Sequence, residues 1–78
     1  MTKIERIAEI NPEFVIADGF DAAIIGTTKS GVVYSADKCL KILMKRAGMN
    51  SEDAEEFFYF NVEGAFVGEY TPVFVWSL

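Results

Sequence analysis

The chain contains no histidine and only one cysteine, two prolines and seven basic residues among its 78 residues. The missing imidazole removes the side chain that most often acts as a general base near neutral pH and as a metal ligand. The single thiol, Cys39, cannot form a disulfide within the chain, which suits a reducing compartment. We therefore expect no catalysis, no bound metal and no cofactor.

Positive charge is also scarce, since twelve acidic residues outnumber the basic ones and the net charge is −5. This is the wrong sign for holding a phosphate backbone, so we expect no binding to DNA or RNA. The longest apolar run is too short to span a membrane. Charges at Lys3, Glu5 and Arg6 lie where a secretory signal needs an apolar core. We expect a cytoplasmic protein without a membrane partner.

Aromatic side chains are in excess near the end of the sequence. Eight of the eleven aromatic residues lie between Phe57 and Leu78. The chain has no linker-like stretch and fits one domain over residues 1–78. So small a domain can hardly bury this apolar surface within one copy, and we predict a homodimer or a higher oligomer. The candidate interface residues are Phe60, Phe74 and Trp76.

A short amphipathic helix is expected near the start. Ile4, Ile7 and Ala8 recur at three-and-four spacing behind Thr2. The Asn-Pro pair at 11–12 should end this helix, because the residue before a proline avoids the helical conformation.

A β-hairpin is expected next. Runs rich in β-branched residues at 23–27 and 32–35 flank a four-residue turn at 28–31. The Asp18-Gly19 pair signals an earlier turn, in which Gly19 supplies a positive φ.

A helix from Ala36 to about Ala47 should follow, with Ser35 as its N-cap and Gly48 beyond its C-terminus. The predicted core face comprises Ala36, Cys39, Leu40, Leu43, Met44 and Ala47. Cys39 is then a buried structural thiol rather than a nucleophile. The other side carries Lys38, Lys41, Lys45 and Arg46, with Ile42 exposed among them.

Another helix is expected after a tight connection, with Asn50 or Ser51 as its cap. Its first turn is acidic, which suits the positive end of the helix dipole. The predicted core face comprises Ala54, Phe57, Phe58, Asn61 and Ala65. Gly64 or Gly68 should end the helix, before a final strand at 73–77.

This order of elements predicts an α+β fold. The hairpin and the C-terminal strand form a small, mainly antiparallel sheet. The helical hairpin and the short N-terminal helix pack on one of its faces.

Asn61 is the polar residue of most interest, because the helical wheel places its amide within the apolar face. An unpaired amide there would cost about 1–3 kcal/mol, so Asn61 needs partners. Asn61 is either a structural clamp that forms hydrogen bonds with the backbone at 18–21 or 64–71, or it binds a small polar ligand together with Glu69 and Thr71. Tyr59, on the opposite side, is either simply exposed or a binding anchor.

Four segments carry a family resemblance: DGFDAAIIG at 18–26, YSADKCLKILMKRAGM at 34–49, EDAEEFFYFN at 52–61 and, above all, FNVEGAFVGEYTPVFV at 60–75. They resemble a family of small uncharacterised proteins of tailed bacteriophages and prophages, whose members share a segment of the form FN-x-x-GA-x-VGE-x-TP-x-F. The resemblance covers nearly the whole chain and implies neither an activity nor a known functional residue. It does imply a viral accessory protein in the cytoplasm of an infected bacterium.

Two functions fit these expectations. The first is a small homo-oligomeric module that binds a host protein, using the aromatic C-terminal region for self-association and the acidic helix face for the partner. The second is an oligomer that sequesters a small anionic ligand such as a nucleotide signal. Its anion-binding residues would be Lys38, Lys41, Lys45 and Arg46. These four residues also fit an ordinary solvated helix face, and we favour the protein-binding module.

Overall fold

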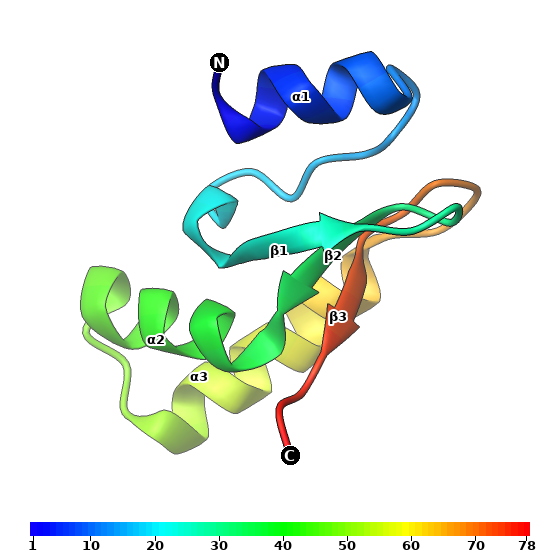
Figure 1. The fold of residues 1–78 in the computed structure, drawn as a ribbon. Helices are drawn as coiled ribbons and strands as arrows, with labels where there is room; N and C mark the ends of the chain where they lie inside the picture. Colours follow the sequence, from blue (N-terminus) through cyan, green and yellow to red (C-terminus); the bar gives the residue numbers. More distant parts are fainter.

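The computed structural model describes residues 1–78, and its helices and strands follow the order α1, β1, β2, α2, α3, β3 (Figure 1). Their bounds are α1 Lys3–Ile10, β1 Ile24–Thr27, β2 Val32–Ser35, α2 Ala36–Ala47, α3 Ser51–Phe57 and β3 Val73–Val75. A 3₁₀ turn, η1 (Asp21–Ala23), precedes β1. Helix α3 continues through a π-helical turn, η2 (Phe58–Val62), and a 3₁₀ turn, η3 (Glu63–Ala65). The predicted small α+β fold is confirmed.

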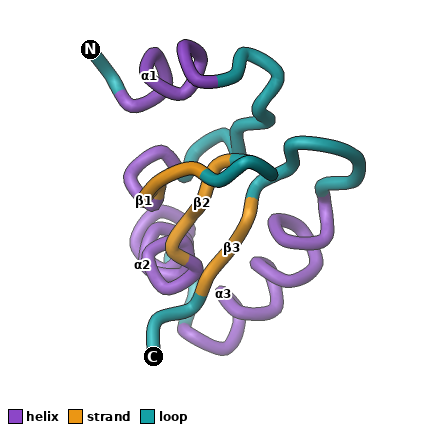
Figure 2. Tube along the Cα trace, turned by 45° about the vertical axis from the view of Figure 1, so that its right-hand side comes forward, coloured by secondary structure: helices purple, strands orange, loops and turns teal.

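Helix α1 begins and ends where the sequence predicts. The Thr2 hydroxyl accepts a hydrogen bond from the Glu5 amide at 3.1 Å, and the Glu5 carboxylate accepts one from the Thr2 amide at 3.0 Å. This reciprocal pair is a capping box, which satisfies two amides that the first helical turn leaves free. Asn11 leaves the helix in an extended conformation. In Figures 1 and 2, α1 lies nearest β1 and apart from α2 and α3.

The sheet has the strand order β1-β2-β3 and is mixed. Strands β1 and β2 form the predicted antiparallel hairpin, with a bulge between Ile24 and Gly26. Strand β3 is parallel to β2, with Val73 beside Val33. This differs from the mainly antiparallel sheet expected, because α2 and α3 together form the long crossover that a parallel pair requires. The last strand is also shorter than expected and ends at Val75.

The hairpin turn packs closely against the segment that leads into β3. A side chain at Gly31 would collide with the backbone carbonyl oxygen of Thr71. A glycine is therefore needed at this position for close backbone approach. Gly19 has the positive φ that the sequence predicts, at 91°.

The caps of the helical hairpin also follow the predictions. Ser35 Oγ accepts from the Lys38 amide at 3.2 Å, Asn50 Oδ1 accepts from the Asp53 amide at 2.8 Å, and Gly48 is left-handed. The buried face of α2 differs from the predicted one, since Ile42 is half-buried while Met44 and Ala47 are exposed. Helix α2 packs against η1 as well as against β2 and α3, and its buried face is shifted toward Ile42 and away from Met44 and Ala47.

One hydrophobic core joins the helices and strands, and Tyr34 of β2 lies within it, fully buried. The Tyr34 hydroxyl accepts a hydrogen bond from the Ala17 amide at 2.8 Å, and burial raises the pKa of this phenol. The Tyr34 ring packs on Phe74 with centroids 5.4 Å apart, and Phe74 packs edge-on against Phe58 at 5.1 Å. None of the helices has the length and apolar composition to cross a membrane.

Candidate functional site

The first candidate surface is aromatic and lies where η2 meets the end of β3. Tyr59 and Trp76 are 48% and 40% exposed, and their ring centroids are 6.2 Å apart. The ring of Phe58, which is fully buried, packs against both. Its centroid lies 5.9 Å from the centroid of Tyr59 and 5.8 Å from that of Trp76. Val75, which precedes Trp76, is also exposed. We refer to Tyr59 and Trp76 as the aromatic surface.

The chain directly after Trp76 is held against the start of α2. The amide and the hydroxyl of Ser77 donate to the same oxygen of Asp37, at 2.8 and 2.6 Å. The hydroxyl bond, followed by the amide bond, lowers the pKa of the Asp37 carboxyl. This contact joins residues 40 positions apart, and no local sequence signal points to it. It orients the segment that carries Trp76.

The three predicted interface residues occupy different environments. Phe74 is half-buried between Tyr34 and Phe58, so its ring packs within the monomer. Phe60 is 76% exposed, and none of the ring pairs includes it. Trp76 alone belongs to the aromatic surface.

The predicted position of Asn61 in the apolar face is wrong, because Asn61 is exposed and its side chain makes no hydrogen bond. In η2 the amide of Glu63 donates to the Phe58 carbonyl five residues earlier, the bond that marks a π-helical turn. This wider turn rotates the residues after Phe58 away from their α-helical directions. Val62 is buried in place of Asn61, and no burial cost demands a partner for the amide.

The other predicted binding residues do not form one site. Glu69 and Thr71 line an open hollow of about 440 Å³ together with Lys29 and Ser30 of the hairpin turn. Tyr70 between them has a φ of 57°, and its ring packs against Phe14 at 5.6 Å. Tyr59 and Asn61 do not line this hollow. The ligand set Asn61, Glu69 and Thr71 is therefore not assembled around a single cavity.

The basic face of α2 is open to solvent. Lys38, Lys41, Lys45 and Arg46 are all exposed, and none of them lines either hollow. The Arg46 guanidinium lies against the turn at Gly19. Positive charge therefore gathers on this face of α2, but the four side chains line no cavity that could hold a ligand.

The thiol of Cys39 is fully buried, as predicted. Burial raises its pKa to about 11, so the sulfur stays protonated near neutral pH. A thiolate, rather than a thiol, is the nucleophile in cysteine chemistry. No group of three or more potential metal-ligating side chains gathers in the structure.

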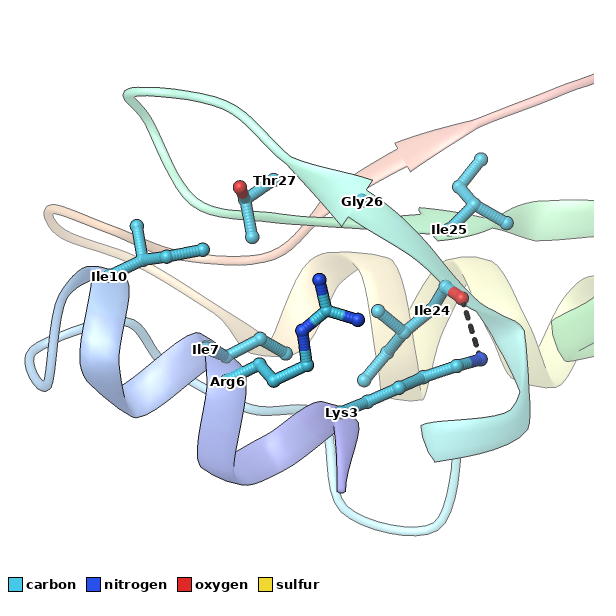
Figure 3. Close-up of a pocket in the computed structure, with 8 residues that line it drawn as sticks. All are labelled: Lys3, Arg6, Ile7, Ile10, Ile24, Ile25, Gly26 and Thr27. Carbon is cyan, nitrogen blue, oxygen red and sulfur yellow. Dashed lines mark hydrogen bonds between the residues drawn. The ribbon is translucent and has the colours of Figure 1, made fainter. Parts of the chain in front are cut away.

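A further candidate surface is a groove of about 330 Å³ between α1 and β1 (Figure 3). Its lining comprises Lys3, Arg6, Ile7 and Ile10 from α1 and Ile24, Ile25, Gly26 and Thr27 from β1. Lys3 Nζ crosses one end and donates to the Ile24 carbonyl at 3.0 Å. The Arg6 guanidinium extends toward β1 and makes no hydrogen bond (Figure 3). We refer to this feature as the α1–β1 groove.

None of the sequence motifs predicted this groove. The spacing of Lys3 and Arg6 does indicate a basic side of the helix, because residues three apart share one helix face. Such a basic side stands out in a chain that is acidic as a whole. The sequence does not show which strand lies opposite them.

Comparisons with protein-family models, with curated proteins and with solved structures find no match for this chain. Its function is therefore inferred from the aromatic surface and the charged faces of the helices.

Proposed function

We propose that this protein is a non-enzymatic phage accessory protein that associates with itself and binds a host protein in the cytoplasm of the infected bacterium. The main supporting observation is the aromatic surface, because Tyr59 and Trp76 remain about half exposed although a buried ring holds them in place. Tyrosine and tryptophan side chains are enriched among the binding hot spots of protein interfaces. The viral context comes from the family resemblance of the segment at 60–75.

Self-association is proposed at the free edge of β3. This strand pairs only with β2, so its other edge has no strand partner. A second copy that adds antiparallel to this edge about a two-fold axis would cover Val75 and Trp76 in both copies. A standard interface needs about 800 Å² from each partner, out of a surface of 5266 Å². Exposed Phe60, on the same π turn as Tyr59, offers additional apolar area.

Host-protein binding is proposed at the acidic start of α3. Glu52, Asp53, Glu55 and Glu56 are all exposed there. Complementary charge speeds the encounter of two proteins and selects among partners. The host surface would accordingly be basic. The absence of histidine and the protonated, buried Cys39 support a binding role over catalysis.

Sequestration of an anionic small molecule has less support. The basic residues of α2 are exposed and line no hollow. We therefore expect no rise in melting temperature with common mono- or cyclic nucleotides at millimolar concentration. A rise of several degrees that Lys41→Glu with Lys45→Glu removes would favour sequestration instead.

Self-association is tested by sedimentation velocity at micromolar concentration. Wild-type protein should sediment as a dimer or larger species, and Tyr59→Ser with Trp76→Ser should sediment as a monomer. Met44→Ser is the control, because Met44 is an apolar residue on α2, outside the aromatic surface, with an exposure of 38% that is close to that of Trp76. Wild-type protein that remains monomeric at this concentration would contradict the proposal.

The host partner is tested by capture from the bacterial host, followed by reconstitution with the purified partner. Glu52→Lys with Glu55→Lys should weaken that binding by at least about tenfold. Lys38→Glu with Lys41→Glu, a reversal of equal size on α2, should change it less. Equal effects of the two reversals would exclude the acidic face as the binding surface.

A further inference from the structure

We infer that the α1–β1 groove is a separate binding site for a short extended peptide segment that presents an acidic and an aliphatic side chain two residues apart. The inference does not depend on the aromatic surface. It follows from the shape of the groove, from its charge and from the open edge of β1.

The two walls of the groove have matching lengths. Helix α1 has eight residues, which span about 12 Å, and β1 has four residues, which span about 13 Å. They run side by side, from Lys3 and Ile24 at one end to Ile10 and Thr27 at the other (Figure 3). An extended segment of about four residues fits this length.

The backbone of β1 can form hydrogen bonds with an added peptide segment. β1 pairs only with β2, so its outer edge has no strand partner. Peptides commonly bind to such edges by adding a strand, with backbone bonds supplying affinity and side-chain pockets supplying specificity. The Ile24 carbonyl is already bonded to Lys3. The available part of the edge therefore runs from Ile25 to Thr27.

The helix wall selects for negative charge. Arg6 extends across the groove and has no hydrogen-bond partner (Figure 3), and Lys3 adds a second cation at the end of the groove. A guanidinium presents donors in a fork that matches the two oxygens of a carboxylate. In a chain with a net charge of −5, this local reversal of sign favours an acidic side chain in the ligand.

The remaining lining is aliphatic. Ile7 and Ile24 are buried beneath the groove, and Ile10 is 62% exposed at its far end. An aliphatic ligand residue two positions from the acidic one would face the same wall and cover Ile10. Gly26 lines the groove, and a Cβ at this position would meet no other atom within 4 Å. A ligand can therefore approach the backbone of β1 closely at Gly26. A larger side chain at this position would block the groove without a clash inside the protein.

The test uses a blocked five-residue peptide with glutamate at its second position and valine at the others, and a charge-reversed match with lysine at the second position. Amide chemical shifts of isotope-labelled protein are followed during titration. The glutamate peptide should shift amides of α1 and β1 and saturate below about 1 mM, and the lysine peptide should not. Arg6→Glu should weaken the glutamate peptide by at least about tenfold and improve binding of the lysine peptide.

Further variants keep the test specific. Gly26→Val should abolish binding without lowering stability in urea. Arg46→Glu, which reverses an exposed arginine outside the groove, should leave binding unchanged. If Arg6→Glu does not fold, Arg6→Gln removes the same charge. Trp76→Ser should retain peptide binding, which separates this site from the proposed self-association.

Several results would overturn the inference. One is an unchanged affinity in Arg6→Glu, and another is a set of shifted amides confined to the aromatic surface. Decanoate is tested as a third ligand beside the two peptides, since it joins one carboxylate to an aliphatic chain without a peptide backbone. Shifts of groove amides with decanoate but with neither peptide would identify a small amphiphile, and not a peptide segment, as the ligand.

Discussion

The two edges of the sheet differ in what lies beside them. At β1, α1 flanks the strand, Lys3 bonds the Ile24 carbonyl, and a bulge interrupts the regular pairing. At β3, no side chain bonds the strand backbone, and the neighbouring groups are the exposed rings of the aromatic surface. Proteins limit unwanted strand pairing with charged side chains and bulges at edges. Both features lie at the Ile24 end of β1, and the β3 edge has neither.

This contrast separates two kinds of contact. An edge with a cation and a helix beside it admits only a short segment of matching charge. A bare edge with aromatic neighbours is suited to a larger apolar interface, although β3 has only three residues with which to pair. We therefore place proposed self-association at β3 and peptide binding at β1.

The largest expected effect on this contrast comes from Phe58→Ala. Phe58 is fully buried and packs against Tyr59, Phe74 and Trp76, so its loss leaves a cavity beneath the β3 side of the sheet. The free energy of unfolding should fall by about 3–5 kcal/mol, as measured by urea denaturation. Phe60→Ala is the matched control and should change it by less than about 0.5 kcal/mol. Similar losses in both variants would mean that Phe58 does not support this surface.

Tyr34→Phe tests the core packing of β2, the central strand, which pairs with both β1 and β3. Removal of the hydroxyl leaves the Ala17 amide without its acceptor in the core, while the ring still packs on Phe74. Unfolding free energy should decrease by about 1–3 kcal/mol. Tyr59→Phe removes an exposed hydroxyl and should have no effect. A Tyr34→Phe variant as stable as wild type would show that the Ala17 amide finds another acceptor.

Thr2→Ala should affect the β1 side alone. Loss of the N-cap hydroxyl should destabilise α1 by about 1 kcal/mol. Hydrogen exchange should become faster in the amides of α1 and remain unchanged in β3. Ser51→Ala, at the start of α3 beside the Asn50 cap, is the control and should leave both regions unchanged. Faster exchange throughout the molecule would contradict a local role for the capping box.

The smallest expected effects are pH-dependent and occur on both sides. Hydrogen bonds to Ser77 lower the pKa of Asp37, and bonds to Thr2 lower the pKa of Glu5. A lowered carboxyl pKa means that the contact is fully present above the unfolded value and is lost as pH falls through the folded one. The Ser77 amide signal should therefore change with a midpoint below the ordinary Asp37 value of 3.8.

Asp37→Asn provides the control for this titration. The Ser77 amide should then show no transition in acid, while the Thr2 amide still responds to Glu5. A midpoint for Ser77 at or above the ordinary value would contradict the hydrogen-bonded geometry of Asp37.

Much of the local structure could be predicted from the sequence. The caps at Thr2, Ser35 and Asn50 lie where predicted, and so do the hairpin turn and the left-handed Gly48. Each of these signals acts between residues at most a few positions apart, through capping hydrogen bonds and backbone conformational preference. The candidate surfaces were less predictable. Tyr59 and Trp76 were both named, but nothing in the sequence paired them with one another.

The sequence by itself therefore determined the bounds of α1, α2 and the hairpin and the start of α3, together with the acidic charge and the aromatic excess of the chain. It did not determine the end of α3, which lies at Phe57 and not at Gly64 or Gly68. Tertiary structure decided the parallel pairing of β3, the bond from Ser77 to Asp37, and the partner strand of α1. It also decided that Val62 faces the core and Asn61 faces solvent. These features depend on contacts between distant residues and on a π turn that shifts the helical phase, and a wheel of constant pitch contains neither.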